Sequence, residues 1–168
     1  MTHAAVQLDW EIERLEAEVA ELDQRELEQL ELEEAIAARG SLAEFVRQAW
    51  HVVEPGTKLL WNWHVDLICS ALERVTAGEL ELLVICVPPG SMKSLLVSVF
   101  WPAWEWLSAP VERSLFLSGS DSVRKRDSRR CRDVIRSTWY QRTLEYLHAE
   151  HPAVVHVGAG VRGAGAAP

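Results

Sequence analysis

The stretch "VPPGSMKSLLVSVFWPAWEW", residues 87–106, decides the fold because it joins two elements of different kinds through one short loop. The run "LLVICV" that leads into the loop, residues 82–87, is continuously apolar and contains β-branched residues, which predicts a strand buried on both faces. After the loop, the apolar spacing predicts a helix from Lys93 to about Leu107. We expect Pro102 to kink this helix, because a proline ring clashes with the carbonyl four residues earlier.

The segments before the loop read as helices. A serine N-cap at Ser41 with a glutamate three residues later, Glu44, forms a capping box that opens a helix over 42–53. A further helix carries apolar residues on one face and ends at Gly78.

The segments after the loop repeat the pattern. The run "RSLFLSGS", residues 113–120, predicts a second strand, and Asp121 is expected to N-cap another helix. The order helix, strand, loop, helix, strand, helix predicts an α/β fold with a parallel βαβ unit, preceded by a long N-terminal helix.

Charge divides the chain into an acidic arm, residues 1–39, and a body, residues 40–150. Residues 1–38 hold twelve acidic and two basic residues, a balance of −10, whereas the whole chain carries −8. The spacing of apolar residues in the arm predicts a long amphipathic helix, and it follows a heptad repeat for two heptads before it slips. Two interpretations remain open: a solvated acidic helix, or a partner-binding helix that self-associates through residues 6–38 as a coiled coil. The heptad positions are occupied by Leu8, Ile12, Leu15, Val19 and Leu22.

The loop itself has two interpretations. The best-known phosphate-binding loop reads G-x-x-x-x-G-K-[ST], and when it is aligned on Lys93-Ser94 its glycines fall on Val87 and Met92. In a working loop the lysine reaches the β- and γ-phosphates of a nucleotide and the hydroxyl completes a Mg²⁺ shell. The alternative is a plain turn between a strand and a helix, with a solvent-exposed lysine.

A basic run follows the second predicted strand. Residues 124–136 carry seven basic and two acidic residues. Helical spacing places Lys125, Arg129, Arg132 and Arg136 on one face. This face is either a solvated helix surface or a contact for a DNA backbone or a neighbouring subunit.

The remaining signals exclude several classes of protein. Three cysteines without a C-x-x-C pair fit neither a disulfide framework nor a zinc site, which favours the reducing cytoplasm. No uncharged apolar run approaches the roughly 20 residues of a membrane span. Of the last eighteen residues, 151–168, eleven are Gly, Ala or Pro, and we expect this tail to be disordered. Its G-x-G-x-x-G pattern has no following helix, so it is not a dinucleotide site.

Residues 42–142 resemble the N-terminal ATPase part of the large subunit of tailed-phage terminases, which are DNA-packaging motors. The most specific piece is "PPGSMKSLLVS" followed by "WPAWEW". It is similar to the variant phosphate loop of many such subunits, in which proline and other residues replace the glycines. The resemblance implies a partial P-loop NTPase core of the RecA-like (ASCE) class over 40–150.

The resemblance also implies roles for individual residues. Lys93 would be the catalytic lysine on the β- and γ-phosphates of ATP, and Ser94 would be a Mg²⁺ ligand. Trp63 and His64 would lie beside the adenine. The residues that would bind the phosphates are Pro89, Gly90, Ser91, Met92, Lys93 and Ser94.

The function that the resemblance implies is ATP-driven translocation of double-stranded DNA, together with the portal and the small terminase subunit. In the family the chain continues to a strand ending in paired acids and to a nuclease domain, and neither pattern follows here. We therefore expect a truncated product that lacks groups needed for ATP turnover. The alternative function is a non-catalytic remnant or an interaction protein that acts through its acidic helix.

Overall fold

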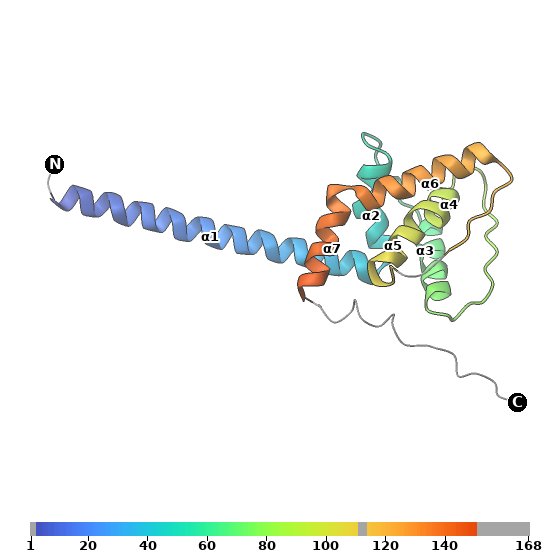
Figure 1. The fold of residues 1–168 in the computed structure, drawn as a ribbon, viewed down its shortest axis with the longest axis horizontal. Helices are drawn as coiled ribbons and strands as arrows, with labels where there is room; N and C mark the ends of the chain where they lie inside the picture. Colours follow the sequence, from blue (N-terminus) through green and yellow to red (C-terminus); the bar gives the residue numbers. More distant parts are fainter. Residues whose placement is uncertain (1–2, 111–113, 151–168) are drawn as a thin grey trace, which may run out of the picture. The chain divides into compact units, whose positions relative to one another are not determined.

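The computed structural model describes residues 3–110 and 114–150, and every regular element in these ranges is a helix (Figure 1). The expected α/β fold with a βαβ core is therefore wrong for the described part of the chain. The tail 151–168 lies outside the described residues. The elements are α1 (His3–Gly40), α2 (Leu42–Val53), α3 (Trp63–Thr76), α4 (Lys93–Leu95), the π-helix η1 (Leu96–Phe100), α5 (Trp101–Ser108), α6 (Asp121–Arg136) and α7 (Thr138–Glu150).

The chain divides into two compact units, Met1–Glu34 and Ala35–Pro168. The described residues of the first unit belong to α1, which confirms the long helix expected there. Its surface side chains interact along the helix, as in the bond from Gln24 Nε2 to Glu28 Oε1 at 2.8 Å. Among the described helices, none has both the length and the apolar character that crossing a membrane requires.

The second unit has one hydrophobic core, to which all of its helices contribute. Phe45 of α2 lies at its centre and is fully buried. Tyr140 of α7 is also buried, and its hydroxyl donates a 2.8 Å hydrogen bond to the carbonyl of Ala103 in α5. This bond satisfies a phenol that would otherwise be costly to bury. The core includes Leu42, Val46, Val65, Leu72, Leu96, Val99, Phe100 and Val134.

Residues 82–87 show why the predicted strand does not form. The segment is extended and lacks secondary structure, and no backbone hydrogen bond joins it to another described residue. Its side chains alternate: Leu83 and Ile85 pack against the core, whereas Leu82 and Val84 are largely exposed. The apolar run therefore correctly indicated an extended backbone, but the predicted burial of both faces of the segment is wrong. A β-strand needs a partner for its N–H and C=O groups, and the described chain supplies none.

The second predicted strand fails for the same reason. Residue 113 lies outside the described residues, and 114–120 are without regular structure up to the start of α6. Phe116 is half-buried, while Leu115 and Leu117 are exposed. The N-cap of α6 is Ser120, one residue before the expected Asp121.

The helix after the loop is confirmed: α4, η1 and α5 form one continuous helical run from Lys93 to Ser108. The run passes through Pro102 without ending. A π-helical turn, Leu96–Phe100, precedes the proline, and the backbone N–H of Trp101 bonds to the carbonyl of Leu96 five residues earlier. Such a turn widens the helix and helps it to accommodate a residue that lacks an N–H donor.

The start of α2 is capped from another helix. Helix α2 begins at Leu42, as expected, but Ser41 makes no side-chain capping bond and Glu44 pairs with Arg47 instead. Glu73 of α3 takes that place, because its Oε1 accepts from the backbone N–H of Leu42 at 2.6 Å and from Ser41 Oγ at 3.2 Å. The predicted capping box is therefore wrong.

Candidate phosphate-binding site

The loop before α4 turns tightly into the helix. Gly90 and Met92 both have left-handed backbone conformations, with φ of 86° and 58°. The hydroxyl of Ser91 donates to the carbonyl of Pro88 at 2.7 Å and closes the turn. Met92 is the N-cap of α4, so Lys93 begins the first helical turn as expected. A non-glycine residue at this φ is uncommon and costs on the order of 1 kcal/mol or more.

A pocket of about 400 Å³ lies against this loop, and we call it the loop pocket. Its lining carries two cationic side chains, Lys93 and Arg126, and no carboxylate among the described residues. Lys93 is exposed and forms no ion pair with any described residue. Lys93 therefore has no counter-charge among the described residues, whereas Arg126 pairs with Asp127, which does not line the pocket; a lining with cations and no carboxylate favours an anionic ligand. The lining residues are Val87, Pro88, Pro89, Gly90, Ser91, Met92, Lys93, Ser94, Leu95 and Arg126.

Sequence reasoning did not single out Arg126. It lies on α6, and its Nε donates to Oδ1 of the neighbouring Asp127 at 2.9 Å. Asp127 is itself only 5% exposed. The carboxylate therefore holds the guanidinium through Nε, so that the two terminal nitrogens remain for a ligand. In the sequence, the basic run 124–136 was the only feature that pointed to a role for Arg126.

The fit to Mg²⁺ differs from the fit to phosphate. Ser94 is exposed at the mouth of the loop pocket and offers one hydroxyl oxygen. No group of three or more His, Cys, Asp or Glu side chains that could hold a metal occurs among the described residues. The lining therefore offers the Ser94 hydroxyl as one candidate oxygen ligand and no carboxylate for a Mg²⁺ ion.

The residues proposed to lie beside the adenine are not brought to the loop pocket. Trp63 begins α3, is 72% exposed and receives its cap from the side chain of Asn62. Its ring and that of His64 meet edge to face at 6.1 Å. Neither residue lines the pocket that contains Lys93.

The basic face of α6 is only partly available to a partner. Lys125 Nζ lies 2.7 Å from Asp121 Oδ2, so its charge is already paired. Arg129, Arg132 and Arg136 form no ion pair with any described residue. Arg132 and Arg136 line a second pocket of about 640 Å³, which we call the α6 groove, whereas Lys125 and Arg129 do not.

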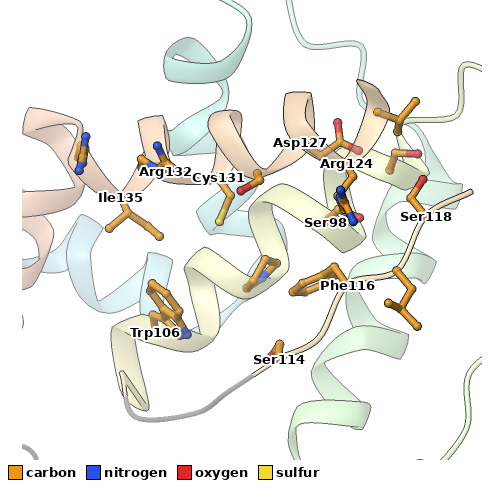
Figure 2. A pocket seen from close by; sticks show the side chains of 16 residues that line it. Ser98, Trp106, Ser114, Phe116, Ser118, Arg124, Asp127, Cys131, Arg132 and Ile135 are labelled. Atoms are coloured by element: carbon orange, nitrogen blue, oxygen red, sulfur yellow. The ribbon is translucent and has the colours of Figure 1, made fainter. Parts of the chain in front are cut away.

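The α6 groove lies between α6, the helical run of η1 and α5, and the extended segment 114–118 (Figure 2). Its floor is apolar, with Trp106 of α5, Phe116 and Ile135. Arginines stand on the α6 side, and Figure 2 shows Arg124 and Arg132 there. Arg124 forms an ion pair with Asp121. The groove therefore combines an apolar surface with two arginines, Arg132 and Arg136, that form no ion pair with a described residue.

The reactivity of the three cysteine thiols tests how the helices of the second unit pack. Burial raises the pKa of the Cys69 thiol to about 12, with nearby Glu73 and Asp66 adding to the effect, and burial raises that of Cys131 to about 11. Cys86 is exposed. Because the thiolate is the reactive form, we expect an aromatic disulfide reagent at neutral pH to label only Cys86 rapidly. All three thiols should react in denaturant, and Cys86→Ser should remove the rapid phase. Rapid labelling of Cys69 in the folded protein would contradict the packing of α3.

Comparison of the chain with protein-family models, with curated protein sequences and with solved structures found no match. The geometry of the loop pocket therefore carries the functional argument.

Proposed function

We propose that the second unit binds the polyphosphate of a nucleotide in the loop pocket, as the ATP-binding part of a DNA-packaging ATPase. In this proposal Lys93 holds the terminal phosphates, Ser94 is a ligand of the accompanying Mg²⁺, and double-stranded DNA is the polymer that the complete motor moves. The portal and the small terminase subunit are its proposed partners.

The observation that carries the proposal is an unpaired lysine in the first turn of a helix, facing a pocket with a second cation and no acid. Backbone N–H groups at the start of a helical run favour anions, and here the run continues from Lys93 to Ser108. Residues 87–95 all line the pocket, and Gly90 and Met92 within this loop have left-handed backbone conformations. A plain connecting turn would not require a strained Met92.

The proposal is tested by thermal unfolding of the full chain with and without Mg-ATP or Mg-ADP. A weak site, with a Kd of about 0.1–1 mM, corresponds to roughly 4–5.5 kcal/mol of binding free energy. Ligand at about ten times Kd should then stabilise the protein by about 1.4 kcal/mol and raise its Tm. Lys93→Ala should abolish this rise and leave the ligand-free Tm nearly unchanged, because the side chain is exposed.

Lys58→Ala provides the matched control. Lys58 is also exposed, and it does not line the loop pocket, so this variant should keep the full nucleotide response. A wild-type chain that unfolds cooperatively but shows no shift at about ten times the weakest assumed Kd would overturn the proposal.

A further inference from the structure

The acidic arm has an apolar surface that no described residue covers within its unit. Ile12, Leu15, Val19 and Leu22 follow the heptad repeat, and their side chains are between 47% and 57% exposed. An amphipathic helix gains little stability from an apolar stripe that remains in water. A stripe of this length therefore points to a partner surface.

The charges that flank the stripe argue against pairing of two arms. In the heptad that places Ile12 and Val19 at a and Leu15 and Leu22 at d, both g positions before the a residues and both e positions after the d residues are acidic. They are Glu11, Glu18, Glu16 and Asp23. A parallel pair would set Glu11 against Glu16 and Glu18 against Asp23 of the other helix. Like charges at these positions oppose a homotypic coiled coil.

The α6 groove has the complementary chemistry. Its arginines Arg132 and Arg136 lack a described ion-pair partner, and Asp127, the acid in its lining, is already bonded to Arg126. Its apolar lining reaches the surface, because Trp106 is 40% and Leu117 84% exposed. An acidic helix with an apolar stripe would pair with these arginines and cover the apolar floor at the same time.

We propose that the acidic arm of a second copy of this chain docks on the α6 groove. The stripe of the arm covers Trp106 and Leu117, and glutamates beside the stripe pair with Arg132 and Arg136. This is the helix-in-groove mode of recognition, with the charges setting the choice of partner. The α6 groove shares only Ser94 with the lining of the loop pocket, and its docking has a readout separate from nucleotide binding.

Sedimentation velocity of the full chain over a range of protein concentrations tests the inference. We expect concentration-dependent association that weakens between about 0.05 M and about 0.5 M salt, because screening acts on the complementary charges. Pairing of two acidic arms would strengthen with salt instead. This comparison uses only wild-type protein, so it does not depend on the folding of any variant.

Charge reversal provides the second arm of the experiment. Arg132→Glu with Arg136→Glu should weaken association by about tenfold or more, and Glu11→Lys with Glu18→Lys should do the same. Mixing the two variants should restore a complex, since each supplies the surface that the other has lost. Lys58→Glu with Arg74→Glu is the control for the arginine reversal, because it changes the net charge by the same amount and in the same direction. Both positions are exposed and lie outside the groove, so association should stay unchanged.

Three results would overturn the inference. The first is a wild-type chain that stays monomeric at all concentrations. Binding of short duplex DNA to Arg132 and Arg136 by such a monomer would also count against the inference. The second is association that increases with salt. The third is association that survives reversal of Arg132 and Arg136.

Discussion

Replacing Phe45 by alanine should lower the free energy of unfolding by about 3–5 kcal/mol, the range for a buried phenylalanine that leaves a cavity. Its ring is fully buried and meets three others edge to face: Phe100 at 6.5 Å, Trp139 at 5.3 Å and Tyr140 at 6.2 Å. These rings come from η1 and α7, so one side chain connects α2 to helices far away in sequence. The free energy of unfolding of a whole domain is only about 5–15 kcal/mol, so this single change removes a large fraction of it.

Denaturant unfolding followed by tryptophan fluorescence measures this loss, because Trp139 lies against the deleted ring. Leu60→Ala is the matched control, since Leu60 is 79% exposed and its truncation should change stability by less than about 0.5 kcal/mol. A loss below about 1 kcal/mol for Phe45→Ala would show that α2 does not pack at the centre of the second unit.

Replacing Glu73 by alanine should lower the free energy of unfolding by about 1.5–3 kcal/mol, the range for hydrogen bonds to a charged group. The carboxylate accepts from the backbone N–H of Leu42 at 2.6 Å and from Ser41 Oγ at 3.2 Å. It also places a negative charge at the N-terminus of α2, where the helix dipole favours it. Equilibrium unfolding in urea measures the change, and Glu73→Gln, which keeps an acceptor oxygen, should lose less than Glu73→Ala.

Glu79→Ala is the control for this second prediction. Glu79 accepts from Arg74 at 3.1 Å in an exposed ion pair, and pairs of this kind contribute only about 0–1 kcal/mol. Equal losses for Glu73→Ala and Glu79→Ala would show that the cap between helices contributes no more than a surface ion pair.

Much of the helical structure could be predicted from the sequence. The bounds of α2, the start of the helix at Lys93 and the long helix α1 were all predicted from the sequence, and the structure has all three. These features depend on contacts within one or two turns, so they are encoded in neighbouring residues. The same reasoning placed Lys93 in the first turn after the loop, and the structure agrees.

The strand predictions failed because a strand is a relation between segments. Residues 82–87 and 114–118 carry the apolar, extended pattern that the sequence indicates. Whether such a segment becomes a strand depends on a partner for its backbone hydrogen bonds, and within the described residues neither segment has one. No local pattern contains that information.

By itself, the sequence determined the helices, the acidic charge of the arm and the position of Lys93. Only the tertiary structure placed Arg126 beside the loop pocket, gave the cap of α2 to Glu73, and set Arg132 and Arg136 over the apolar floor with Trp106. Each of these arrangements brings together residues at least 26 positions apart, the separation of Trp106 and Arg132. Such contacts form when the helices bury their apolar faces together, so they depend on the packing of the whole unit rather than on any one segment.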